Sequence, residues 1–133
     1  MADQDIDLLS KFNFAESGSE KQAWVANTYV AFNRLNSGRY GDTLPEVLQG
    51  MSSAIKTNSK QWQLATGQQK RNEYEDNVMK EIIQTQYLIK TGKIENPIGN
   101  ATHFENIEKF GVPYWAKKMK KIGKVGKHTY YEE

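Results

Sequence analysis

The sequence contains no cysteine and only two histidines, and these shortages exclude several kinds of functional site. Without cysteine the chain can form no disulfide and no thiolate metal site, and it has no cysteine nucleophile. His103 and His128 stand far apart, outside the H-E-x-x-H pattern of a zinc-binding helix. We therefore expect neither a catalytic metal nor a cofactor.

Long apolar runs are missing as well. No segment approaches the roughly 20 apolar residues that a membrane-spanning helix needs, so we expect no stable membrane insertion. The N-terminus carries Asp3, Asp5 and Asp7, where a secretory signal peptide would carry basic residues and an apolar stretch. We expect a protein that is made in the cytoplasm without a signal peptide and that leaves by another route if it acts outside.

What remains is the composition of one small globular domain. A chain of 133 residues can bury a single core, and we expect one domain over residues 1–133. The formal net charge is only +2, yet residues 117–127 hold six lysines and no acid. Such a run is either a solvated helix face or a basic surface that meets a polyanion. The small net charge argues against a nucleic-acid partner.

Apolar residues recur at helical spacing in four segments that capping or breaking residues bound. We expect helices over residues 3–14, 19–35, 43–50 and 71–91. Residues 19–22 and 43–46 fit capping boxes at the start of the second and third of these helices. A fifth helix is expected to begin at Pro113 and to end before Gly123.

Two short stretches rich in β-branched and aromatic residues, 101–104 and 128–131, indicate strands. We expect them to pair as an antiparallel β-hairpin that carries the fifth helix in its loop. The segment 51–69 is ambiguous: residues 52–55 fit an extended stretch, and the rest fits a loop anchored on the fold. The fold class that these patterns predict is α+β, mostly α, with a small sheet near the C-terminus.

Glu16 is the first candidate for catalysis, since it follows an apolar run and precedes three small residues. Apolar neighbours such as Phe14 and Trp24 would withdraw the carboxyl from water and raise its pKa, as a general acid requires. Ser17 is placed to hydrogen-bond and orient the carboxyl. An ordinary exposed glutamate before a turn fits this stretch better when the stretch is taken alone. Glu20 has a sufficient structural role in the first turn of the next helix, where the helix dipole favours an acid.

Four residues of the expected hairpin, Thr102, His103, Tyr130 and Tyr131, combine polar groups with aromatic faces. Such side chains suit sugar rings, which offer an apolar face and a rim of hydroxyl groups. They equally suit a hairpin that packs on the helices with its polar tips in water. No second carboxylate is placed for the common two-carboxylate glycosidase scheme. A single acid is sufficient if an N-acetyl group of the substrate assists, which points to N-acetylated glycans.

Five stretches match known motifs in the same order along the chain. Residues 100–104 are N-A-T-H-F, residues 113–123 contain P-x-W-A followed by lysines, and residues 126–131 are G-K-H-T-Y-Y. Residues 16–20 keep both acids of E-A-R-G-E, and residues 37–40 are S-G-R-Y. This pattern resembles the spore cortex-lytic cell-wall hydrolase family (SleB/CwlJ-like catalytic domains). The chain departs from it at positions 18, 19 and 105, where Gly, Ser and Glu replace Arg, Gly and His.

The resemblance implies a lysozyme-like, lytic-transglycosylase-like domain whose partner is the glycan strand of peptidoglycan. It implies cleavage between N-acetylmuramic acid and N-acetylglucosamine, by a lytic transglycosylase or a muramidase, with Glu16 as catalytic acid and base. The residues then expected to bind substrate are Ser17, Glu20, Thr102, His103, Tyr130 and Tyr131.

The resemblance also leads to a prediction of where the protein acts and leaves one alternative function open. A compact lysin without a leader is typical of a bacteriophage, as an endolysin or as a virion-borne lysozyme beside other virion proteins. Either would act on the host cell wall. The alternative is a non-catalytic peptidoglycan-binding or virion structural protein that retains the fold, although the intact Glu16 argues against it.

Overall fold

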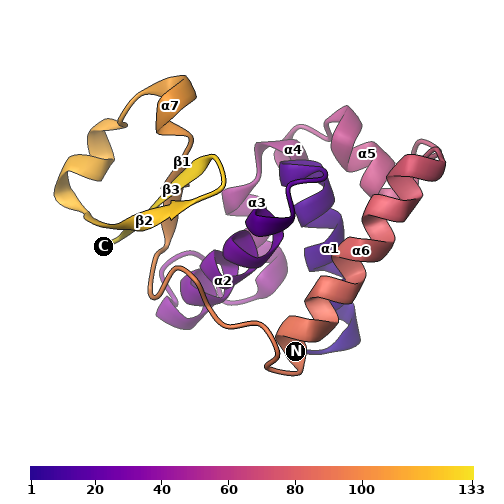
Figure 1. Cartoon of the computed structure of the whole chain (residues 1–133), viewed down its shortest axis with the longest axis horizontal. Coiled ribbons are helices and arrows are strands. Elements are labelled where there is room, and N and C mark those ends of the chain that lie inside the picture. The colour runs from indigo at the N-terminus through magenta and orange to yellow at the C-terminus, as the bar shows by residue number, and fades with distance from the viewer.

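The computed structural model describes all residues, 1–133, and is mostly helical with one small antiparallel sheet. In chain order the elements are α1 (Asp3–Ser17), α2 (Lys21–Ser37), α3 (Leu44–Met51), α4 (Ser53–Lys56), α5 (Lys60–Thr66), α6 (Glu73–Lys90), β1 (His103–Glu105), α7 (Ile107–Phe110), the 3-10 helix η1 (Tyr114–Lys118), β2 (Lys120–Val125) and β3 (His128–Glu132). Figure 1 shows α1–α6 gathered in one lobe, with the sheet, α7 and η1 in a second lobe beside α2. This architecture confirms the predicted α+β class. None of the helices is both long enough and apolar enough to cross a bilayer.

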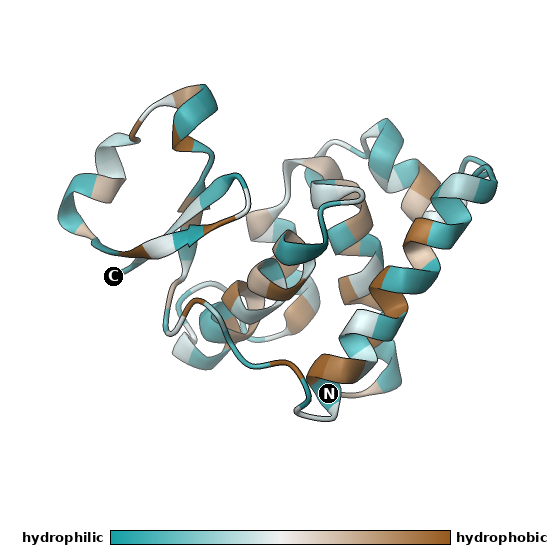
Figure 2. Ribbon diagram, viewed as in Figure 1, coloured by the Kyte–Doolittle hydropathy of each residue, from teal (hydrophilic) through white to brown (hydrophobic).

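The helix α1 lies between two hydrophobic cores, which is why its sequence is apolar on more than one side. Phe14 joins a core with residues of α2, α5 and α6, including Trp24 and Ile82. Leu9 and Phe12 join a second core with α2 and α3. Figure 2 shows brown and teal positions alternating along α6, as expected of a helix with one buried side. Packing on both sides fixes the C-terminal end of α1 in place.

A buried polar cluster joins α1, α2 and α6 between these cores. The Thr28 hydroxyl donates to the Trp24 carbonyl oxygen at 2.7 Å and accepts from the Asn13 amide at 3.0 Å and the Gln86 amide at 3.1 Å. The side chains of Asn13, Thr28 and Gln86 are all fully buried. Buried polar groups need such partners, so this cluster fixes the relative register of the three helices.

Some predicted helix starts are confirmed and one is wrong. Thr43 caps α3, since its hydroxyl accepts from the Glu46 backbone N–H at 3.4 Å. No side chain caps α2, whose N-cap is Glu20, so the capping box expected at residues 19–22 is wrong. The Trp24 indole N–H instead donates to the Gly18 carbonyl oxygen at 2.8 Å, and this bond ties the turn between α1 and α2 to the core.

The segment 51–69 is helical, so the extended stretch expected at residues 52–55 is wrong. The hydroxyl of Ser52 accepts from the Ile55 N–H at 3.1 Å and begins α4. The hydroxyl of Ser59 accepts from the Trp62 N–H at 3.3 Å and begins α5. Each short helix forms because a serine satisfies backbone donors that would otherwise be unpaired at its first turn.

The predicted pairing of the two C-terminal strands is confirmed, and a third strand joins them. β1 and β3 pair antiparallel, with His103 opposite Tyr131. β2 pairs on the other side of β3, so the strand order is β1-β3-β2. The helix expected from Pro113 to Gly123 is therefore wrong beyond η1, which ends at Lys118.

The lysine-rich segment becomes a strand because β3 offers it backbone partners along a free edge. Ile122 and Val125 pack against the core between the sheet and α2, and a bulge between Lys121 and Gly123 shifts the register. The lysines of β2 are exposed on this edge strand. Exposed lysines on an edge oppose pairing with another chain, which gives the run a structural role.

The sheet is joined to α2 by polar contacts as well as by a core. The Asn33 amide donates to the carbonyl oxygens of Gly99 and Ala101, both at 2.9 Å. Arg34 Nε donates to the Thr102 carbonyl oxygen at 2.7 Å. These bonds seat the start of β1 on the second half of α2 and leave little freedom between the two lobes.

Replacing Thr28 by valine is expected to lower the free energy of unfolding by about 1–3 kcal/mol, because the buried Gln86 and Asn13 amides lose an acceptor. Urea denaturation measures the loss. The matched control is Thr85→Val, since the exposed Thr85 hydroxyl also donates to a carbonyl oxygen four residues earlier but serves no side chain. Equal losses in the two variants would contradict the role of the buried cluster.

Candidate active site

Glu16 lies in the last turn of α1, half-buried, with its carboxyl held by a residue from another part of the chain. The hydroxyl of Ser52 donates a hydrogen bond to Glu16 Oε1. Ser52 is itself fully buried and is fixed by the N–H of Ile55, so its hydroxyl has a defined position. The second carboxyl oxygen, Oε2, accepts no hydrogen bond from the protein and is the one left for a substrate.

The environment of Glu16 acts on its acidity in two opposite directions. Burial raises its pKa above the ordinary value of 4.5, because a charged carboxylate loses its hydration there. The hydrogen bond from Ser52 and the electrostatic influence of His128 act in the other direction, since both favour the carboxylate and lower the Glu16 pKa. The burial effect is the largest, so the net shift is upward. A carboxyl in such surroundings holds its proton to a higher pH than an exposed glutamate does, which is the direction that a general acid requires.

The turn between β2 and β3 faces this end of α1. Lys127 in the turn forms an ion pair with Glu20, the N-cap of α2, at 3.0 Å. His128 follows it at the start of β3, with its ring edge-on to Phe104 at 5.4 Å between centroids. His128 Nδ1 is buried and has no hydrogen-bond partner in the protein. The site therefore has Glu16 and Ser52 on the helical side and His128 on the sheet side.

Ser17 and Tyr130 belong to a hydrogen-bonded chain behind the site. The Asn27 amide donates to the Ser17 hydroxyl oxygen at 3.0 Å, and the Tyr130 hydroxyl donates to Asn27 Oδ1 at 2.9 Å. Tyr130 is fully buried, and burial raises the pKa of its hydroxyl. The orienting hydrogen bond expected from Ser17 to Glu16 is made by Ser52 instead. Ser17 and Tyr130 link the end of α1 to the sheet.

Thr102, His103 and Tyr131 form a second group at the other end of β3. The Thr102 hydroxyl lies 2.9 Å from His103 Nδ1. The His103 ring lies 5.2 Å from the Trp115 ring, which in turn lies 5.5 Å from that of Tyr131. Burial, together with the charges of the neighbouring arginines on α2 and after it, lowers the pKa of His103, so the ring is neutral at neutral pH. Thr102 and Tyr131 are buried, whereas His103 is half-buried.

Sequence reasoning did not name His128, Ser52 or Asn27 as contributors to the site. Ser52 lies in the segment without a clear period, and only its capping position before α4 could have marked it as a fixed hydroxyl. Asn27 lies on the buried side of α2, where a polar residue among apolar ones signals a required hydrogen bond. No group of three or more His, Asp or Glu side chains is placed to hold a metal ion.

Comparisons with known proteins identify the family. The sequence matches the family described as Cell Wall Hydrolase over residues 17–131, so the chain belongs to the cell wall hydrolase family. The catalytic domain of the germination-specific lytic transglycosylase SleB from Bacillus anthracis aligns with a TM-score of 0.62 at 20% identity, over 99% of this chain and 97% of that one. The catalytic domain of the Bacillus cereus SleB protein aligns with a TM-score of 0.63 at 22% identity, over 98% and 91%. A comparison with curated protein sequences gave no match.

These findings confirm the family and the fold that the motifs predicted. The fold is that of the SleB catalytic domains, a lysozyme-like arrangement of helices with a small sheet. The family match begins at Ser17, one residue after Glu16. Glu16 lies outside the matched range and is a candidate through its geometry: its carboxyl is half-buried, held by Ser52 and influenced by His128.

Replacing Glu16 by glutamine is expected to change how stability depends on pH. Because folding raises the Glu16 pKa, the native state keeps a proton that the unfolded chain releases. The stability that this proton gives the native state is fully present below pH 4.5, and it is lost as pH rises through the folded-state pKa. In urea denaturation the wild type should therefore lose stability relative to Glu16→Gln as pH rises above 4.5. Glu95→Gln, in an exposed loop, controls for the loss of one carboxylate. A stability difference that does not change with pH would contradict the raised pKa.

Proposed function

We propose that the chain cleaves the glycan strand of peptidoglycan between N-acetylmuramic acid and N-acetylglucosamine, as a lytic transglycosylase in which Glu16 is the acid and then the base. One observation carries the proposal: a member of the cell wall hydrolase family holds a half-buried, proton-retaining carboxyl on Ser52 beside the sheet. The fold shared with a domain described as a lytic transglycosylase supports it. The bacteriophage setting stays a prediction of the sequence.

In the first step Glu16 acts as general acid. Oε1 is held by Ser52, so Oε2 carries the proton and delivers it to the glycosidic oxygen. The bond between that oxygen and the anomeric carbon of the muramic sugar then breaks, and positive charge develops on the carbon. The new carboxylate is stabilised by the same Ser52 hydrogen bond and by the electrostatic influence of His128, both of which act to lower the Glu16 pKa. Burial favours the proton before the step, and these two groups favour its departure.

In the second step the Glu16 carboxylate acts as general base. It takes the proton of the C6 hydroxyl of the muramic sugar, whose oxygen forms a bond to the anomeric carbon. The product is a 1,6-anhydro sugar, no water is consumed, and Glu16 is protonated again. A single-acid mechanism fits the site, because the other nearby acid, Glu20, forms an ion pair with Lys127.

The other predicted site residues take supporting roles in this proposal. His103 is the half-buried member of its group and stays a candidate for binding a sugar hydroxyl. Thr102 and Tyr131 hold His103 and Trp115 in place. Ser17, Glu20 and Tyr130 position the two sides of the site through the Asn27 bridge and the Lys127 ion pair.

Glu16→Gln is expected to slow the clearing of purified peptidoglycan at least about 100-fold, because glutamine can neither donate nor accept the proton. Turbidity measures the rate, and circular dichroism confirms that the variant is folded. Glu95→Gln, which removes a carboxylate from an exposed loop, is expected to clear at the wild-type rate. Clearing by Glu16→Gln at the wild-type rate would overturn the assignment of Glu16.

The products identify the reaction. Mass spectrometry of the wild-type digest is expected to find 1,6-anhydromuramic ends, whereas reducing muramic ends would replace the transglycosylase by a muramidase. Sedimentation with peptidoglycan without any released product would favour the non-catalytic alternative.

A further inference from the structure

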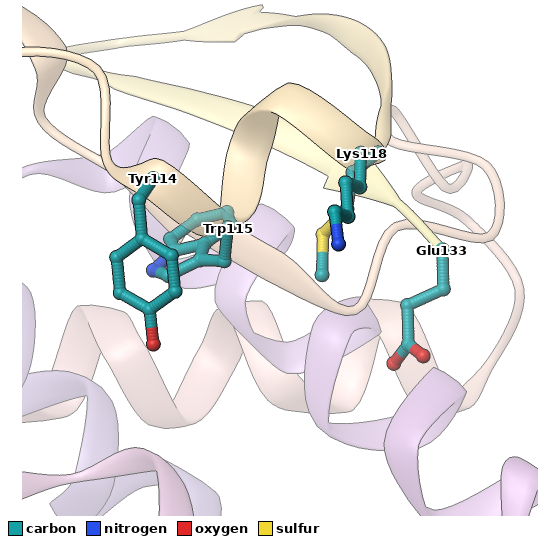
Figure 3. Close-up of a pocket in the computed structure, with 5 residues that line it drawn as sticks. Tyr114, Trp115, Lys118 and Glu133 are labelled. Carbon is teal, nitrogen blue, oxygen red and sulfur yellow. The ribbon is translucent and has the colours of Figure 1, made fainter.

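A hollow of about 350 Å³ lies at the end of β3 opposite to the Glu16 site. Tyr114, Trp115, Lys118, Met119 and Glu133 line it (Figure 3). Glu133 directly follows β3, whereas His128, beside Glu16, begins that strand. Five residues of extended chain separate the two positions by about 17 Å. The hollow is therefore distinct from the place where Glu16 would act.

The local sequence explains why one aromatic ring in the hollow is fixed and its neighbour is free. Pro113 precedes the tight 3-10 turn of η1, and successive residues of such a turn point about 120° apart. The Trp115 ring packs between His103 and Tyr131, at 5.2 and 5.5 Å between centroids. Tyr114 points away from the core and is 86% exposed, the largest exposed fraction among the large apolar side chains. One ring gives a fixed wall and the other an accessible face.

Charged groups complete the hollow on the side opposite the rings. Figure 3 shows the Lys118 and Glu133 side chains on one side and the Tyr114 and Trp115 rings on the other. Glu133 Oε2 is paired with Arg39 at 2.7 Å, which keeps the carboxylate in place. Lys118 makes no ion pair, so all its N–H donors are available to a ligand. The hollow thus offers aromatic faces, ammonium donors and a fixed carboxylate acceptor.

We propose that this hollow binds one sugar ring of a peptidoglycan glycan strand, away from the bond that is cleaved; this rests on the proposed function. The apolar face of a sugar lies on Tyr114 and Trp115, as sugar rings do on aromatic side chains. Lys118 donates to its hydroxyl or acetamido oxygens, and Glu133 accepts from a hydroxyl group. The volume is at the lower end of the about 300–1,000 Å³ range of small-molecule sites, which suits a single ring.

Such a site would retain the enzyme on the polymer between cleavages. A ligand held at the far end of β3 from His128 adds binding energy that is independent of the reacting bond. Loss of the hollow is therefore expected to weaken binding to long strands while leaving the chemistry at Glu16 unchanged.

The test measures binding without cleavage, in the Glu16→Gln background. Peptide-free glycan strands, prepared by amidase treatment of peptidoglycan, are titrated into the protein and followed by the Trp115 indole N–H signal in NMR. Tyr114→Ala is expected to weaken binding about three- to tenfold, since an aromatic contact contributes about 0.5–1.5 kcal/mol. Tyr87→Ala, which removes an exposed tyrosine of α6 that does not line the hollow, is the matched control and should bind like the parent.

The outcomes separate this proposal from the proposed function. Equal binding by the Tyr114→Ala and Tyr87→Ala proteins, or a Trp115 signal that does not move, would overturn the sugar site whatever the wild type cleaves. A Trp115 signal that moves with free stem peptides but not with glycan would assign the hollow to a peptide and would equally overturn it. Failure of the wild type to release products bears only on Glu16.

Discussion

The site depends on one constraint, the burial of α1 on both sides. Because Phe14 faces one core and Leu9 and Phe12 face another, the helix can neither slide nor rotate without exposing apolar surface. Its last turn is therefore held where Ser52 reaches it. The Glu16 carboxyl is half-buried as a consequence of the packing of the rest of α1. The position and burial of the Glu16 carboxyl are thus determined by core packing more than by the residues next to Glu16 in sequence.

Glu16 is subject to two opposing influences on its pKa, and a carboxyl that must act as both acid and base needs both of them. Burial alone would hold the proton and leave a poor donor in the first proposed step. Ser52 and His128 alone would favour the carboxylate and leave no proton to give. The structure combines them, and burial has the larger effect. An acid with this balance can pass a proton out and take one back with little rearrangement of the protein around it.

The long elements and the strand pairing were predictable because local signals agree with the fold there. Helical spacing located α1, α2, α3 and α6, with correct capping as a further signal at α3, and β-branched and aromatic residues located β1 and β3. The strand β2 was not predictable in this way, since its lysines and the preceding Pro113 fit a helix. Its conformation is decided by the free edge of β3, which is a tertiary partner. Ser52 was missed because its role depends on Glu16, 36 residues away in sequence.

The hydrogen-bonded chain from Ser17 through Asn27 to Tyr130 has a consequence for how a glycan enters the site. It ties the end of α1 to the middle of β3 through a buried side chain, and the sheet is also tied to α2 by Asn33. A hinge between the two lobes would have to break these hydrogen bonds, and the loss of the buried Tyr130–Asn27 bond is the most costly. The two sides of the site are thus held in fixed relative positions before a ligand binds, so the site is preorganised. A preformed site of this kind loses little conformational entropy when a ligand that fits it binds.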